Sequence, residues 1–147
     1  MKITDVKVFR MATPVHKTAG TNWLFVRIDT DAGISGWGEG SLQYKDAALE
    51  AEILDFGKFL EGKDPRRIDW IWSSLYRRVT WAGGPVSMSA ISAIDLALWD
   101  LKAKSLEIPV WELAGGMHRD KVRVYANGWF EDLTEAVPGV PAETEKK

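Results

Sequence analysis

The chain has 147 residues, a hydrophobic fraction of 46% and a formal net charge of −2. This length fits one domain, or one domain with a piece of a second, and the composition is sufficient for a hydrophobic core. The small net charge gives no electrostatic footprint for nucleic acid, and the lack of cysteine excludes disulfides. No apolar run reaches the ~18 residues that span a membrane. The charged, alternating start is unlike a signal peptide, so we expect a cytoplasmic protein. The eight tryptophans predict large buried contacts.

The first third of the chain has the two-residue period that is typical of β-strands. Residues 2–11 and 23–30 alternate apolar and polar side chains, and residues 34–39 form a third, shorter run. Gly33 lies between the last two runs and can supply the positive φ of a tight hairpin turn. We therefore expect a three-stranded antiparallel meander.

Residues 12–22 form a long connection between the first two expected strands. This segment is either an ordinary surface loop or a lid, because long loops within compact domains are often functional. In the second case, His16 and Lys17 are the residues that would meet an anionic ligand.

Two amphipathic helices are expected next. Residues 44–60 carry apolar side chains at spacings of three and four, and Gly62 ends this helix. Asp64 and Pro65 then supply an N-cap and a first helical residue for the second helix. The apolar stripe of the second helix consists of Ile68, Ile71, Trp72, Leu75 and Val79.

A third expected helix is apolar on nearly every side. It begins after a serine cap, Ser87 or Ser89, and runs to about Leu106. Such a helix is buried on more than one side, which suggests a chain that packs against something larger than itself. Its acids, Asp95 and Asp100, are five residues apart and point to different faces, so we expect structural hydrogen bonding and no shared site.

The remaining third of the chain offers little chemistry. Residues 121–128 have the pattern of one more strand, and residues 131–147 have no sustained apolar period. There is no phosphate-binding glycine loop and no nucleophile elbow, and His16 and His118 lack metal-ligand spacing.

Four segments occur in a recognisable order. They are GWGEG at 36–40, GKDPRRIDWIWSSLYR at 62–77, the glycine-framed helix at 83–116 and VYANGW at 124–129. Together they closely resemble the N-terminal region of the mandelate racemase / muconate lactonizing enzyme group of the enolase superfamily. Among its members, the galactonate, gluconate and mannonate dehydratases are the most similar.

The resemblance implies an α+β fold in three parts. Residues 1–116 form a capping domain, a meander followed by a helical bundle. Residues 117–130 hold only the first strand of a (β/α) barrel, and residues 131–147 form an irregular tail.

The resemblance also implies a reaction. A base removes the proton α to a carboxylate, Mg²⁺ stabilises the enediolate, and the β-hydroxyl leaves. In the family, the metal ligands and the acid/base residues lie on later barrel strands, so no catalytic or metal residue transfers to this chain. We expect the chain alone to be inactive. Its implied partners are a sugar acid and the missing barrel, in a homo-oligomeric enzyme.

Five residues are candidates for substrate binding. His16 and Lys17 lie in the loop that closes over substrate in the family, and Gln43 follows the third strand. Trp81 precedes the long helix, and Asn127 ends the first barrel strand. Glutamine and asparagine suit hydroxyl recognition because each offers both a donor and an acceptor.

Other hypotheses stay open. The chain could be a non-catalytic remnant that self-associates through exposed apolar surface. Within the family, racemase or cycloisomerase activity is also compatible, because these enzymes share the cap. A small enzyme active in its own right is disfavoured, since no base and no metal cluster can be assembled.

Overall fold

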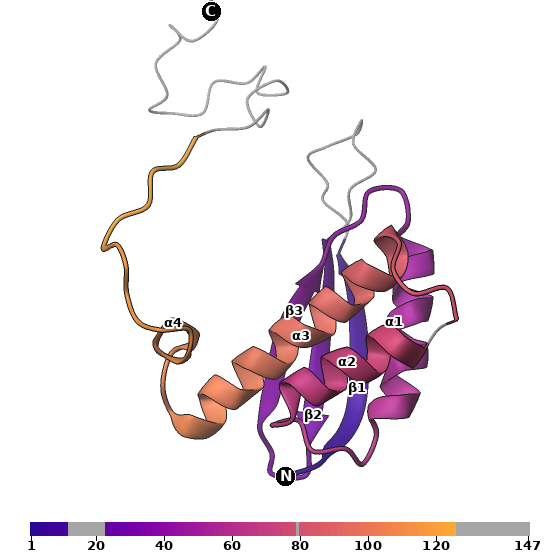
Figure 1. Cartoon of the computed structure of the whole chain (residues 1–147), viewed down its shortest axis with the longest axis horizontal. Coiled ribbons are helices and arrows are strands. Elements are labelled where there is room, and N and C mark those ends of the chain that lie inside the picture. Colours follow the sequence, from indigo (N-terminus) through magenta and orange to yellow (C-terminus); the bar gives the residue numbers. More distant parts are fainter. Residues whose placement is uncertain (12–22, 79, 126–147) are drawn as a thin grey trace, which may run out of the picture. The chain divides into compact units, whose positions relative to one another are not determined.

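The computed structural model describes residues 1–11, 23–78 and 80–125 (Figure 1). The chain divides into two units, Met1–Met117 and His118–Lys147. In the second unit, the described residues 118–125 contain neither helix nor strand. The strand that we expected over residues 121–128 is therefore not formed where it is described. A strand needs hydrogen bonds from a neighbour, and a barrel strand takes them from other barrel strands.

A three-stranded antiparallel sheet forms the N-terminal part, which confirms the expected meander. Its strands, in the spatial order β1-β2-β3, are β1 (Ile3–Met11), β2 (Trp23–Thr30) and β3 (Ser35–Gly40). Leu24, Val26 and Ile28 of β2 are all buried, as the alternation predicts. Gly33, in the β2–β3 turn, has a φ of 73°, a conformation that glycine adopts without steric cost.

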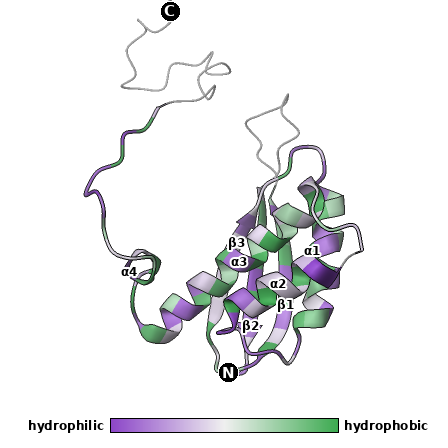
Figure 2. Ribbon diagram, viewed as in Figure 1, coloured by the Kyte–Doolittle hydropathy of each residue, from purple (hydrophilic) through white to green (hydrophobic). Residues whose placement is uncertain are grey.

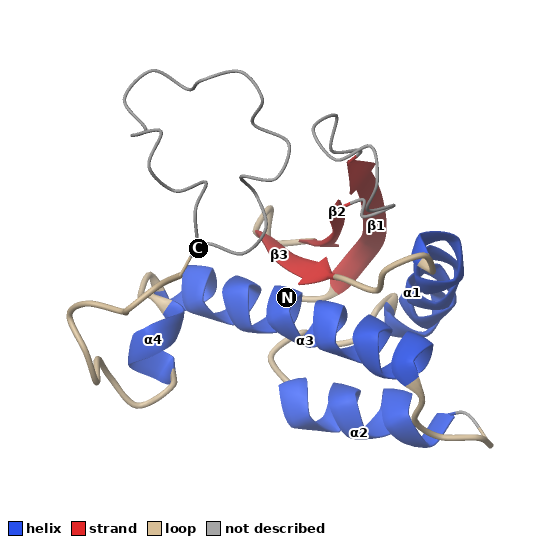
Figure 3. Cartoon of the chain, turned by 90° about the horizontal axis from the view of Figure 1, so that it is seen from above, coloured by secondary structure: helices blue, strands red, loops and turns tan. Residues whose placement is uncertain are grey.

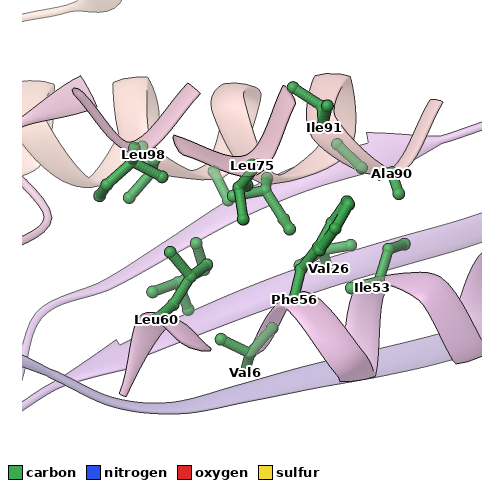
Figure 4. Close-up of a cluster of buried hydrophobic side chains, with 14 of the residues drawn as sticks. Val6, Val26, Ile53, Phe56, Leu60, Leu75, Ala90, Ile91 and Leu98 are labelled. Carbon is green, nitrogen blue, oxygen red and sulfur yellow. The ribbon is translucent and has the colours of Figure 1, made fainter. Parts of the chain in front are cut away.

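Four helices follow the sheet. They are α1 (Asp46–Leu60), α2 (Ile68–Arg78), α3 (Pro85–Leu106) and α4 (Val110–Leu113). α1 and α3 pack on one face of the sheet, and α2 packs on α3 (Figure 3). The shared core contains the expected stripe of α1, Leu49, Ile53, Phe56 and Leu60, together with apolar residues of the strands and of α2 and α3 (Figure 4). The described residues contain no helix that is long and apolar enough to cross a membrane.

α3 lies at the centre of this arrangement. The sheet, chiefly β3, contacts it on one side, and α1 and α2 contact it on others. The chain itself thus covers most of a helix that we expected to need a larger partner. Leu96 remains 49% exposed and Trp99 is half-buried. Charged residues gather toward the C-terminal end of α3, where Figure 2 shows hydrophilic colour.

Glycines of β3 allow α3 to approach the sheet closely. A Cβ atom added at Gly38 would lie 2.8 Å from the backbone nitrogen of Ala97, and one at Gly36 would lie 2.9 Å from that of Leu101. Both distances are shorter than van der Waals contact. Backbone therefore packs directly on backbone here, and a larger residue at either position has no room.

Two helix starts differ from the sequence-based expectation. α2 begins at Ile68 and not at Pro65, because Asp64 caps a preceding turn. Its carboxylate accepts hydrogen bonds from the backbone and side chain of Arg66, and the Arg66 guanidinium holds the pKa of Asp64 at about 2. α3 begins at Pro85 after Gly84, without a side-chain cap, and the Ser87 hydroxyl donates to Glu52.

The tryptophans are more exposed than we expected. Of the seven that the structure describes, six are exposed: Trp23, Trp37, Trp70, Trp72, Trp81 and Trp111. Trp72, which we placed in the apolar stripe of the second helix, is 38% exposed and stacks on Tyr76 with ring centroids 5.3 Å apart. The expectation of large buried contacts was wrong, since the aliphatic side chains and alanines fill the core.

Candidate functional site

One end of the sheet gathers the segments that we expected to approach a substrate. Met11 pairs with Trp23, and Leu24 pairs with Gly40, so the last residues of β1 and β3 lie beside the first residues of β2. We call this the loop end, because residues 12–22 connect β1 to β2 there. His16 and Lys17 lie outside the described residues, and so does Asn127.

Gln43 belongs to the same region of the molecule. It follows the last residue of β3, Gly40, by three positions, and it is exposed in the connection to α1. An exposed amide at the loop end can donate to and accept from a ligand hydroxyl.

A pocket of about 260 Å³ lies where the N-terminal part of α3 meets the loop end. It lies between the end of β3 and the first turns of α3 and is lined by Glu39, Gly40, Ser41, Pro85, Met88, Ser89 and Ser92. Trp81 precedes α3 by four residues and is 90% exposed. Neither Gln43 nor Trp81 lines the pocket itself.

The pocket contains hydroxyl groups that the sequence analysis did not select. Ser41, Ser89 and Ser92 contribute one hydroxyl each, and that of Ser41 donates to the Glu39 carboxylate at 2.5 Å. Each hydroxyl is both a donor and an acceptor. The sequence signal was the run of serines in residues 87–92, of which we interpreted two as alternative helix caps.

The two acids of α3 have different neighbours, as their spacing predicts. The Asp100 carboxylate accepts the backbone N–H of Trp37 at 2.8 Å and the Lys104 ammonium at 2.6 Å. Burial raises the pKa of Asp95, the Asp69 carboxylate adds to the effect, and a hydrogen bond from Trp99 opposes it. Asp100 thus ties α3 to the free edge of β3, and neither acid belongs to the loop end.

The described residues do not fit a magnesium site. In the ranges 1–11, 23–78 and 80–125, no three His, Cys, Asp or Glu side chains come close enough together to hold a metal ion. Mg²⁺ is bound through oxygen ligands, chiefly carboxylates with water and substrate groups. The described part of the loop end offers one carboxylate, that of Glu39, beside an amide and hydroxyls, and no second carboxylate joins it there to hold this ion.

Comparison with known proteins identifies the family. The model of the mandelate racemase / muconate lactonizing enzyme N-terminal domain matches residues 1–115. A D-galactonate dehydratase of Variovorax paradoxus (strain S110) is 45% identical over 126 residues, which is 86% of this chain and 31% of that protein. A D-galactonate dehydratase of Pectobacterium atrosepticum is 40% identical over 145 residues, which is 99% of this chain and 36% of that protein.

A solved structure is also similar to this chain. The crystal structure of an enolase from Pantoea ananatis with bound D-gluconate and Mg superposes with a TM-score of 0.73 at 38% sequence identity. The match covers 81% of this chain and 28% of that one. The chain spans about a third of the length of the curated relatives that it matches. It therefore belongs to the mandelate racemase / muconate lactonizing enzyme family of the enolase superfamily, and it contains the N-terminal domain of that family.

Proposed function

We propose that this chain is the substrate-capping domain of an acid-sugar dehydratase. The observation that carries the proposal is the match of residues 1–115 to the family's N-terminal domain, joined to relatives named D-galactonate dehydratase at 40–45% identity. In the proposed reaction, a base removes the proton α to the carboxylate of the sugar acid. The β-hydroxyl then leaves, and the resulting enol becomes a 2-keto-3-deoxy acid.

The chemistry of the loop end supports a hydroxylated ligand. Gln43 offers an exposed amide, and the neighbouring pocket offers the hydroxyls of Ser41, Ser89 and Ser92. Groups that both donate and accept hydrogen bonds suit the alternating hydroxyls of a sugar acid. In this proposal His16 and Lys17 bind the substrate carboxylate, and Trp81 and Asn127 are further candidates for contact with the substrate.

Binding is the proposed contribution of this chain, and the proton transfers belong elsewhere. The described residues do not fit Mg²⁺, so no metal-dependent step is assigned to them. We propose that the base and the metal ligands of the complete enzyme come from a barrel domain, at the ends of its strands, where the sites of such barrels lie. Racemase or cycloisomerase activity is the competing proposal, since one cap serves all three reactions.

A chimeric enzyme tests the proposal. Residues 1–115 would replace the matching segment of the Variovorax paradoxus D-galactonate dehydratase. We expect the purified chimera to convert D-galactonate to its keto acid when Mg²⁺ is added, and the 147-residue chain alone to be inactive. Product formation is followed by chromatography. A chimera that is folded and yet inactive would refute the capping role, and so would turnover by the chain alone.

A point variant then locates the contact. In the chimera, Gln43→Ala removes one hydrogen bond to a neutral hydroxyl, which is worth about 1 kcal/mol. We expect KM for D-galactonate to rise about fivefold with a smaller change in kcat. Lys58→Ala, an exposed position in the last turn of α1, is the matched control and should leave both constants unchanged. Equal effects of the two variants would argue against Gln43.

A further inference from the structure

The first two turns of α3 form one wall of the pocket at the loop end. Four of the residues that line this pocket come from α3, namely Pro85, Met88, Ser89 and Ser92. Their spacing of three and four residues places them on one face of the helix. A rotation or tilt of these turns would therefore move all four side chains together. The shape of the pocket, and the directions of the Ser89 and Ser92 hydroxyls, depend on what holds this end of α3.

The chain that leads into α3 does little to fix the position of the helix. Gly83 and Gly84 precede it with φ values of 92° and 83°, in a region that glycine enters freely. A Cβ atom added at either glycine would meet nothing within 4 Å, so no neighbour encloses them on that side. The described structure also shows no side-chain cap at the start of α3, and its first residue, Pro85, has no N–H to donate. The position of the first turns must therefore come from contacts of the helix itself.

The close contact between β3 and α3 does not extend to these turns. The glycines of β3 meet the helix at Ala93 and at residues after it. Residues 85–92 come before this contact, where the pocket lies between the helix and the strand. The core buries Ala90 and Ile91 on the inner side of the turns, but apolar burial is non-directional. A directional contact is therefore needed to fix the rotation of this end of α3.

A hydrogen bond from α1 supplies such a contact in the first turn of α3. The Ser87 hydroxyl donates to the Glu52 carboxylate at 2.8 Å, and both side chains are half-buried. A hydrogen bond to an ionised acceptor is stronger than one between neutral groups, and it requires a defined geometry. Ser87 is the third residue of α3 and lies off the face that lines the pocket. The bond therefore holds the helix from another side and opposes a rotation that would displace the pocket face.

We propose that Glu52 is a positioning residue of the substrate site, which acts through Ser87 to hold the first turns of α3 and, with them, the pocket hydroxyls. Glu52 does not line the pocket, so it acts on a ligand only through the helix. Its charge suits this place, because a carboxylate is favourable near a helix N-terminus and α3 has no acid in its own first turn. The effect on substrate rests on the proposed function, whereas the anchoring of α3 is a property of this domain alone.

Hydrogen exchange of the 147-residue chain tests the anchor without any substrate. The amide of Met88 donates to the Gly84 carbonyl at 3.0 Å, so mass spectrometry can follow the hydrogen-bonded amides of residues 88–92. Glu52→Ala and Ser87→Ala should each speed exchange there about fivefold, the factor that corresponds to one net hydrogen bond. Glu52→Gln keeps an acceptor oxygen and should stay close to the parent chain. The double variant should exchange no faster than either single variant, because both substitutions remove the same bond.

Kinetics of the chimeric enzyme test the consequence for binding. Glu52→Ala and Ser87→Ala should raise KM for D-galactonate about threefold or more with a smaller change in kcat, and Glu52→Gln should restore KM. A residue that only stabilised the fold would lower the amount of active enzyme and leave KM unchanged. Ser105→Ala is the matched control, because it removes a hydroxyl that donates to the Lys102 carbonyl near the other end of α3. It should change neither KM nor the exchange of residues 88–92.

The two measurements separate the ways in which the proposal can fail. Unchanged exchange in Glu52→Ala, or an equal effect of Ser105→Ala, would overturn the anchor whatever the enzyme does. Faster exchange with an unchanged KM would overturn the positioning role, because the pocket would then not need the anchor. A folded parent chimera without activity would refute the proposed function and the effect on KM with it, while the exchange data still decide whether Glu52 anchors α3. Far-UV circular dichroism of every variant establishes that the compared proteins are folded.

Discussion

Gly38→Ala tests the close approach of α3 to β3, which sets the position of the helix over the sheet. The new Cβ atom would meet the carbonyl oxygen of Ala93 and would lie 2.8 Å from the backbone nitrogen of Ala97. Both obstacles are helix backbone and cannot rotate away. The only relief is movement of α3 from the sheet.

The size of that movement follows from the contact distance. Carbon and nitrogen pack at about 3.5 Å, so α3 must shift by at least about 0.7 Å from β3. A gap of 0.5–1 Å costs each facing atom pair roughly a quarter to a half of its dispersion energy. Overpacked cores lose about 1–3 kcal/mol, and we place Gly38→Ala at the upper limit of that range, about 3 kcal/mol.

Gly40→Ala is a control in the same strand. Its added Cβ would lie 3.2 Å from the Ala93 methyl and 3.2 Å from Leu49 Cδ2, and these side-chain atoms can yield by a few tenths of an ångström. We expect a loss below about 1 kcal/mol. Urea unfolding followed by circular dichroism measures both variants. Equal destabilisation by the two substitutions would refute the reasoning, because it would mean that backbone contact is no stricter than side-chain contact.

Three further predictions concern carboxylates. Asp100→Ala deprives the Trp37 N–H of its acceptor and should lower the free energy of unfolding by about 1 kcal/mol. Asp100→Asn, which keeps an oxygen, should lose less in the same urea titration. Burial alone would raise the pKa of Asp29, but hydrogen bonds from Ser35, Lys7 and Arg27 hold it at about 2, below its usual 3.8. Its stabilisation, about 2 kcal/mol, is therefore complete above the usual value and is lost as the pH falls toward 2. Asp29→Asn should remove that acid dependence, whereas Asp55→Asn, at an exposed position, should not. Because burial raises the pKa of Asp95, its ionisation destabilises the fold. The parent chain should lose stability as the pH rises from the usual value of 3.8 through the folded-state pKa of Asp95, whereas Asp95→Asn should not. The two proteins should therefore be equally stable below pH 3.8, and the variant should be the more stable one at higher pH.

The spacing of apolar residues along the sequence correctly predicted β2 and α1, because in each element one side faces the core. The alternation in residues 23–30 identified β2 and its buried face, and the spacing of Leu49, Ile53 and Phe56 identified the buried stripe of α1. Both patterns report burial directly, since one side of each element faces the core. The resemblance of the segments between 36 and 116 identified the family because those segments combine turns, caps and packing contacts in one order.

Features that depend on tertiary neighbours were missed. Gly36 and Gly38 recur every second residue, and Ala90, Ala93 and Ala97 recur at helical spacing, but only the fold brings these two small-residue stripes together. The prediction that the tryptophans are buried failed for a related reason. A count of tryptophans does not show which face of a helix or strand the rest of the protein covers. Trp37 alternates correctly on its strand and still lies on the outer face.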